Sequence, residues 1–243
     1  MKIIVISDLH LKYNDSPGES EKLARFNKFL AEIKQDTDLL ILNGDIFDLW
    51  FSWNKVIIKQ YFPVLRKFAE LIERGCRIVF IAGNHDFWFN DFLTEYLKIE
   101  IYPDHWCEEI DGKKIFAAHG DVYTYNDGRY RFFRKIVRNK LIKAIFSQLH
   151  PDLALTLASG LSRSSRRKPI PDKLQKMREK GLLENADQLL KKHDIVIFSH
   201  SHLPRIVIRE NGVYVNSGDW INHFSYISII NGQVSLKKYR DKE

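Results

Sequence analysis

Five short motifs rich in aspartate and histidine interrupt this chain, and each one follows an apolar run directly. In chain order they are Asp8-Leu9-His10, Gly44-Asp45-Ile46-Phe47-Asp48, Gly83-Asn84-His85-Asp86, His119-Gly120-Asp121 and Ser199-His200-Ser201-His202. In an open parallel sheet, ligands gather outside the carboxyl ends of the strands. The pattern therefore predicts a sheet that brings these distant motifs to one edge.

The first third of the chain alternates apolar runs with helical spacing. Ile3–Ser7, Leu39–Asn43 and Arg77–Ala82 have the composition of buried parallel strands. Glu19–Gln35 and Lys55–Arg74 space their apolar residues as helices do. This β-α-β-α-β start indicates an α/β protein with a parallel sheet.

Further strands are expected on both sides of a helical stretch. The expected strands are Ile99–Tyr102, Trp106–Ile110, Lys114–Ala118, Asp194–Phe198, Arg205–Arg209, Val213–Asn216, Phe224–Ile230 and Gln233–Lys237. Hairpin turns are expected at Asp111-Gly112, Asn211-Gly212 and Asn231-Gly232, because such pairs favour tight turns.

Residues 127–191 differ from the rest of the chain. Tyr130–Phe146 reads as one amphipathic helix, His150-Pro151-Asp152 begins a second, and Lys173–Lys192 is a third. Ser159–Pro171 reads as a polar, basic break. We therefore predict a core of 1–125 and 191–243, interrupted by a helical insertion at 126–190.

Charge is concentrated in that insertion. Residues 129–180 hold 15 of the 38 Lys+Arg and only three acids. Such asymmetry indicates an anionic partner, although a solvated helical surface explains it equally well. With 44% apolar residues the chain can build a sizeable core. Two cysteines, no signal peptide and no spanning segment make us expect a cytoplasmic protein.

The motifs supply carboxylate, imidazole and amide oxygen donors without thiolates. That set suits manganese, iron, zinc or magnesium. The D-x-H and H-x-H spacings place both side chains on one side of an extended backbone. Each motif alone is more often a turn, a structural histidine or a surface pair. Five in series favour a site for two metal ions, which can clamp both oxygens of a displacement at phosphorus.

The order and spacing resemble the calcineurin-like metallophosphoesterases, whose pattern is D-x-H, G-D-x-x-D, G-N-H-[DE], H-G and G-H-x-H. Only Ser199, which replaces a glycine, departs from it. The resemblance implies a four-layer α/β/β/α sandwich and a metal-activated hydroxide as nucleophile. It implies one metal held by Asp8, His10 and His202, a second held by Asn84, His119 and His200, and Asp45 as the bridge between them.

His85 has no place among those seven ligands. The resemblance implies that it acts as an acid or phosphate stabiliser at the leaving group, with Asp48 orienting it. A simple hydrogen bond to a loop is the competing interpretation. Asp86 and Asp121 fit supporting or turn-capping roles better than ligand roles.

Several segments resemble one branch of the family, the UDP-2,3-diacylglucosamine diphosphatases of lipid A biosynthesis. They are Gly44–Trp50, His119-Gly120-Asp121 with Phe133-Arg134, Leu149-His150-Pro151 and His202-Leu203-Pro204. The resemblance implies hydrolysis of a pyrophosphate bond to UMP and 2,3-diacylglucosamine 1-phosphate. The implied substrate contacts are Asn84, His85, Asp127, Tyr130, Arg163, Ser165, Arg166 and His200. One letter differs, since the best-known members of this branch carry Arg at the position of His85.

The insertion would then be a lid over the site. Its apolar residues would enclose acyl chains, and its basic face would rest on an anionic membrane surface, which implies a peripheral protein of the inner membrane. Manganese is the preferred ion. The alternatives are a nuclease or cyclic-nucleotide phosphodiesterase, whose insertion would track a nucleic acid backbone, and a non-catalytic scaffold. We expect no nucleic acid partner, because the aromatic residues of the insertion are spaced to face inward.

Overall fold

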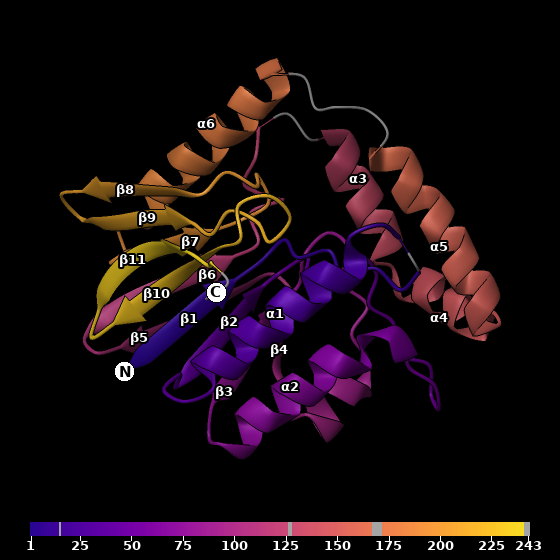
Figure 1. Ribbon diagram of the computed structural model, residues 1–243. Helices are drawn as coiled ribbons and strands as arrows, with labels where there is room; N and C mark the ends of the chain where they lie inside the picture. Colours follow the sequence, from indigo (N-terminus) through magenta and orange to yellow (C-terminus); the bar gives the residue numbers. More distant parts are fainter. Residues whose placement is uncertain (15, 126–127, 167–171, 241–243) are drawn as a thin grey trace.

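The computed structural model describes residues 1–14, 16–125, 128–166 and 172–240. Two sheets stack face to face, and helices cover both outer faces (Figure 1). The four-layer α/β/β/α sandwich predicted from the sequence is confirmed.

The first sheet has the order β11-β10-β1-β2-β3-β4. Its parallel strands are β1 (Lys2–Ile6), β2 (Leu39–Asn43), β3 (Arg77–Ile81) and β4 (Glu100–Tyr102). The antiparallel strands β10 (Ser225–Ile230) and β11 (Gln233–Lys238) complete it. Asn231 and Gly232 join them with φ of 49° and 77°, so the expected turn is confirmed.

The second sheet has the order β5-β6-β7-β9-β8. Its strands are β5 (His105–Ile110), β6 (Lys113–Ala118), β7 (Ile195–Phe198), β8 (Arg205–Arg209) and β9 (Gly212–Asn216). The Asp111-Gly112 turn is confirmed, with φ of 51° and 70°. The turn expected at Asn211-Gly212 is wrong by one residue, because Gly212 already pairs with Arg209. Gly212 lies against the Asp194 backbone, where a Cβ atom would clash.

Alternating residues along β1 fill two different cores. Ile3 and Val5 face the space between the sheets, while Ile4 and Ile6 face the helix layer. That layer contains α1 (Glu19–Ile33) and α2 (Phe62–Glu73), with the 3₁₀ turn η1 (Lys59–Tyr61) before α2 and the π-helical turn η2 (Phe92–Tyr96) after β3. The helix expected from Lys55 therefore begins later. Pro63 lies in the first turn of α2, where its missing N–H costs nothing.

The outer layer on the second sheet is α6 (Asp172–Leu189). Its Leu182 and Ala186 are buried against Phe198 and Tyr214. The second half of the predicted insertion is thus packed on the core sandwich, while the division into domains stays a prediction.

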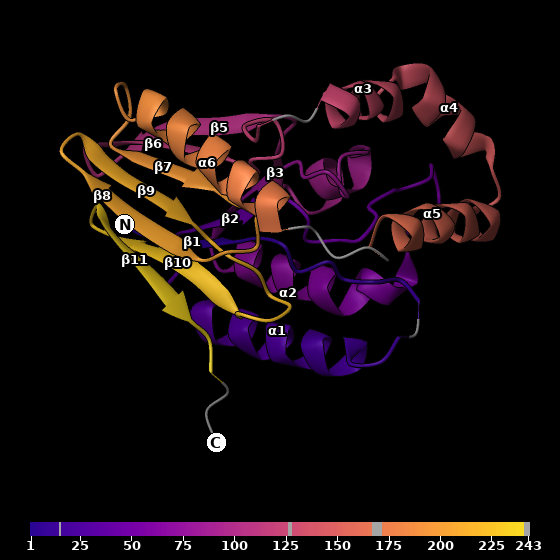
Figure 2. The same cartoon turned by 90° about the horizontal axis from the view of Figure 1, so that it is seen from above.

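The other helices of the insertion stand beyond the strand ends in both views (Figures 1 and 2). They are α3 (Gly128–Val137), α4 (Lys140–Gln148) and α5 (Pro151–Arg166), called the three-helix insertion below. The single helix expected over Tyr130–Phe146 is wrong: Asn139 caps a new helix, its side chain accepting from Leu141 N at 2.8 Å. The break expected from Ser159 is also wrong as far as Arg166, because this stretch contains no proline, and serine and arginine are tolerated within a helix.

Contacts tie the three-helix insertion to the core. Trp88 Nε1 donates to the Val137 carbonyl at 2.7 Å, and the Phe146 ring lies 4.7 Å from that of Trp88. Arg138 donates to the Gly83 carbonyl at 2.8 Å. Phe132 is 69% exposed, so not every aromatic side chain of the insertion faces inward as expected.

Candidate metal centre

All seven expected metal ligands lie at one edge of the sandwich. Each motif begins within three residues of a strand's carboxyl end: β1, β2, β3, β6 and β7. This is the edge at which parallel strands collect functional side chains. The seven are Asp8, His10, Asp45, Asn84, His119, His200 and His202.

Five of these residues have a left-handed backbone. Their φ values lie between 46° and 67°, and they are Asp8, His10, Asp45, His200 and His202. Such conformations cost about 1–3 kcal/mol each and persist only where the surroundings impose them. Here the loops are tied to each other, since Asp8 N donates to the Gly44 carbonyl and His10 N to the Asp45 carbonyl. Strain of this kind concentrates at functional sites.

Three of the side chains form a first group. His202 Nε2 lies 3.2 Å from Asp8 Oδ1, and His10 Nε2 lies 3.9 Å from the same oxygen. One ligand atom from each of the three residues falls within 4.8 Å of the others. A single cation can therefore be reached by all three.

A second group surrounds His119. Asn84 Oδ1 lies 3.1 Å and His200 Nδ1 3.3 Å from His119 Nε2. Asp45 Oδ2 lies 3.4 Å from His119 Nε2 and 3.6 Å from His10 Nε2. The Asp45 carboxylate thus stands between the two groups.

The donor atoms fit bound cations. Asp8 Oδ1 and both ring nitrogens of His10 are buried and have no hydrogen-bond partner among the described residues. Buried polar atoms without partners are costly unless a ligand satisfies them. Oxygen and imidazole donors are those that manganese, iron and zinc accept.

Neighbouring carboxylates and imidazoles shift the pKa values of the groups in the site. Burial alone would lower the pKa of His119, but the carboxylates of Asp45 and Asp8 outweigh it and raise that pKa to about 10. Burial likewise opposes ionisation of Asp45, yet His119 and His85 hold its pKa well below the usual range. The pKa of His200 falls to about 3 through burial and the neighbouring His119. Charge that favours protonated imidazole also attracts metal cations.

Asp86 fastens two of the loops together. Its Oδ1 accepts from Gly83 N and Asp45 N, and its Oδ2 accepts from Ile46 N and Phe47 N. Burial and the nearby Asp45 raise the pKa of Asp86, and the donated N–H bonds oppose that rise. Asp86 therefore supports the site as the sequence predicted.

Replacing Asp86 by Asn is expected to lower the free energy of unfolding by about 3 kcal/mol, because two backbone N–H groups lose their acceptor. Urea denaturation measures this change. Asp91→Asn, at an exposed position, is the control and should stay within about 0.5 kcal/mol of the parent. Equal stability of the Asp86 variant and the control would contradict the inference that Asp86 holds the two loops together.

His85 and Asp48 lie together beside the first group. His85 Nδ1 is 3.5 Å from Asp48 Oδ1, and its ring centroid is 4.8 Å from that of His10. Asp48 Oδ1 also lies 3.9 Å from His10 Nδ1. The expected pair is thus in contact. The Asp48 carboxylate also lies beside His10, which is one of the predicted metal ligands.

Two supporting residues escaped sequence reasoning. The Asn43 carbonyl lies 3.0 Å from His119 Nδ1, which leaves Nε2 to face Asn84 and His200. Asp219 Oδ2 lies 3.8 Å from His202 Nδ1, while its Oδ1 accepts from three backbone N–H groups. The sequence offered no signal for the first contact, because any residue at position 43 presents a backbone carbonyl.

Ser199, the departure from the family pattern, has a defined place. It is buried, its hydroxyl accepts from Asn43 Nδ2 at 2.7 Å and it lies 2.8 Å from the Ser217 hydroxyl. The serine hydroxyl, which a glycine would lack, thus links the ends of β2, β7 and β9 beside the predicted ligands.

The expected substrate residues are placed unequally. Asn84, His85 and His200 lie at the centre itself. Tyr130 is in the first turn of α3, and Arg163, Ser165 and Arg166 are in the last turns of α5, but their side chains fall outside the described part of the structure. Asp127 lies outside the described residues altogether. Asp121, expected as a support, accepts from Arg134 Nε of α3 at 3.0 Å.

This sandwich and its edge of carboxylate, imidazole and amide donors define a metal-dependent phosphoesterase. The model of the calcineurin-like phosphoesterase family matches residues 1–204, and the chain belongs to that family. A protein from Porphyromonas gingivalis named UDP-2,3-diacylglucosamine hydrolase is 30% identical, over 100% of this chain and 99% of its own length. A protein of the same name from Psychromonas ingrahamii is 25% identical, over 97% of this chain and 96% of its own length.

A solved structure described as a novel archaeal phosphodiesterase shares the fold. It has a TM-score of 0.51 and 17% identity, and the match covers 98% of this chain and 99% of that one. The family model and the relatives named as hydrolases confirm the enzyme class expected from the sequence: the chain is a metal-dependent hydrolase of phosphoesters.

Proposed function

We propose that this enzyme hydrolyses the pyrophosphate bond of UDP-2,3-diacylglucosamine to UMP and 2,3-diacylglucosamine 1-phosphate. The full-length similarity to the Porphyromonas gingivalis protein carries this proposal. It spans the three-helix insertion as well as the motifs, and the metal motifs alone name the reaction but not the substrate.

The seven clustered residues would hold two divalent cations, with manganese preferred. Asp8, His10 and His202 would bind one, Asn84, His119 and His200 the other, and Asp45 both. When bound, such a pair lowers the pKa of water and neutralises charge on the reacting phosphate.

The protein's own groups would orient and protonate the reacting atoms. The water oxygen bonds to the phosphorus of the UMP half, and the bond from that phosphorus to the bridging oxygen breaks. His85 turns Nδ1 toward Asp48, so its Nε2 is the nitrogen to donate a proton to the departing phosphate. Asp48 lies beside both rings and would fix the position of His85 relative to His10.

The three-helix insertion would hold the acyl chains and meet the membrane. Its exposed apolar side chains are Phe132, Ile136, Leu141, Ile142, Ile145, Leu153 and Leu157. Exposed Lys135 and Lys140 lie on the same helices. Apolar residues flanked by cations favour an anionic lipid surface. Within the described residues, no helix is long and apolar enough to cross a bilayer.

The double variant Leu141→Ser/Ile145→Ser is expected to bind phosphatidylglycerol vesicles about 30-fold more weakly, because each half-inserted side chain contributes about 1 kcal/mol. Vesicle co-sedimentation gives the affinity. Ile208→Ser is the control, since Ile208 is 78% exposed on β8, far from α4 in both views (Figures 1 and 2). If the control weakens binding as much as the double variant, the proposed membrane surface is wrong.

A manganese-supported assay tests the substrate. UDP-2,3-diacylglucosamine, bis-p-nitrophenyl phosphate and single-stranded DNA are compared at equal enzyme concentration. We expect the lipid nucleotide to be cleaved with the highest kcat/KM and to yield UMP. Cleavage of the generic diester alone refutes the substrate, and faster digestion of DNA makes the enzyme a nuclease.

A further inference from the structure

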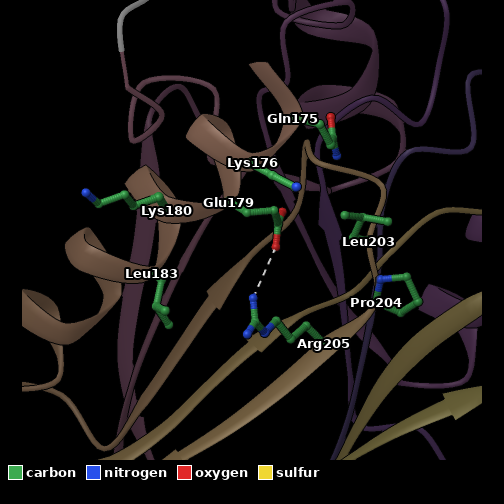
Figure 3. A pocket seen from close by; sticks show the side chains of 8 residues that line it. All are labelled: Gln175, Lys176, Glu179, Lys180, Leu183, Leu203, Pro204 and Arg205. Atoms are coloured by element: carbon green, nitrogen blue, oxygen red, sulfur yellow. Dashed lines mark ion pairs between the residues drawn. The ribbon is translucent and has the colours of Figure 1, made fainter. Parts of the chain in front are cut away.

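A groove of about 630 Å³ runs between α6 and the start of β8 (Figure 3). We call it the α6–β8 groove. Its helix side is formed by Gln175, Lys176 and Glu179, and its strand side by Leu203, Pro204 and Arg205. That volume lies within the range of roughly 300–1,000 Å³ typical of small-molecule sites.

One end of the groove lies next to residues of the metal centre. Gln175 Nε2 donates to the Ser201 carbonyl at 2.9 Å, and Ser201 stands between His200 and His202. Leu203 follows His202 directly. A substrate with one phosphate at the metal centre can therefore extend into this groove.

Glu179 offers an acceptor inside the groove. Its side chain is only 14% exposed, and its Oε2 lies 3.7 Å from Arg205 Nη1 across the groove (Figure 3). Its Oε1 is buried and has no hydrogen-bond partner within the described parts of the chain. A desolvated carboxylate oxygen without a donor is costly, so a ligand that brings hydroxyl donors would be favoured.

The remaining walls match a nucleoside monophosphate. Lys176 directs its amino group toward Gln175 and Leu203 (Figure 3). Gln175 contacts Ser201, and Leu203 follows His202, so this is the end beside the metal centre. A cation at that end suits a phosphate, and the apolar Leu203 and Pro204 suit the face of a base.

We propose that the α6–β8 groove binds the nucleoside end of the substrate, with Glu179 accepting hydrogen bonds from the ribose hydroxyls. An acidic side chain on the ribose is a recurrent device of nucleotide sites. This inference rests on the proposed function, because it assigns the UMP half of that substrate to one side of the centre. The acyl half then extends toward the three-helix insertion.

The first test uses product inhibition. UMP and 2′,3′-dideoxy-UMP compete against hydrolysis of bis-p-nitrophenyl phosphate by the manganese-loaded enzyme. The parent enzyme is expected to prefer UMP by about tenfold, and Glu179→Gln to reduce that preference to about twofold, since a neutral acceptor is weaker than a carboxylate. Glu184→Gln, at an exposed position on α6, should keep the tenfold preference.

An unchanged preference in Glu179→Gln, or no inhibition by UMP, overturns the proposal. The generic diester separates this outcome from the substrate question, because its hydrolysis does not depend on the lipid. An enzyme that cleaves UDP-2,3-diacylglucosamine but keeps its ribose preference in Glu179→Gln refutes the groove alone.

A second test locates the base without measuring activity. Photolysis of bound 5-iodo-UMP followed by peptide mass spectrometry is expected to mark residues 175–183 or 203–205. UMP should compete with the labelling, and Glu179→Gln should reduce it. Labelling confined to α3, α4 or α5 overturns the assignment.

Discussion

Asp45→Asn is expected to lower kcat/KM for bis-p-nitrophenyl phosphate by at least about 1,000-fold, because charge stabilisation by two cations is worth several kcal/mol. Asp45 Oδ2 lies close to both groups, at 3.4 Å from His119 Nε2 and 3.6 Å from His10 Nε2. An amide in that place weakens both sites while keeping the shape of the side chain. Steady-state kinetics measure the first effect and manganese content the second.

Asp91→Asn makes the same chemical change at an exposed position and should keep activity and two manganese ions per chain. Circular dichroism confirms that the Asp45 variant is folded. Activity near that of the parent in Asp45→Asn, with two ions still bound, would refute the bridging role.

Gly44→Ala is expected to lower activity by at least about 100-fold through displacement of His119. A Cβ atom on Gly44 would stand 2.5 Å from His119 Nδ1 and 2.8 Å from Gly83 Cα, so a predicted ligand or the neighbouring loop must move. Displacements of about 1 Å at a reacting centre can cost that much. Kinetics and manganese titration of the folded variant measure the effect.

Gly75→Ala is the control that separates the steric clash of an added Cβ atom from the backbone strain of a positive φ. Gly75 has φ of 90°, close to the 82° of Gly44, but no atom of the described structure lies within 4 Å of its would-be Cβ. This control should lose about 1–2 kcal/mol of stability and keep full activity. If both variants lose activity equally, the close approach of Gly44 to His119 is not what the site requires.

The residues of the metal edge could be predicted because the signal is local. A polar residue shortly after an apolar strand, such as Asp8 or Asp45, is visible within a few letters of the sequence. Parallel pairing of the strands then brings such residues to the same edge of the sheet. The parallel sheet and the helices beside it followed from local patterns too, because strand and helix periods differ. The four-layer arrangement was implied by the resemblance to the family. The Asp111 and Asn231 turns followed from their own residue pairs.

Two of the misses arise from contacts between distant residues, and a third arises from a local helix cap. Gly212 looked like half of a turn, but its closeness to Asp194 places it in the strand and moves the turn to the residues before it. The support from Asp219 to His202 joins separate loops, so no spacing announces it. The helix break at Asn139 depends on a cap that competes with an otherwise continuous amphipathic pattern.

The central claim, two cations held at one edge by seven residues, is tested most directly by anomalous diffraction from a manganese-soaked crystal. The account predicts two anomalous peaks. One should lie among Asp8, His10 and His202, and the other among Asn84, His119 and His200, with Asp45 touching both. A single peak, or two peaks elsewhere, would contradict it.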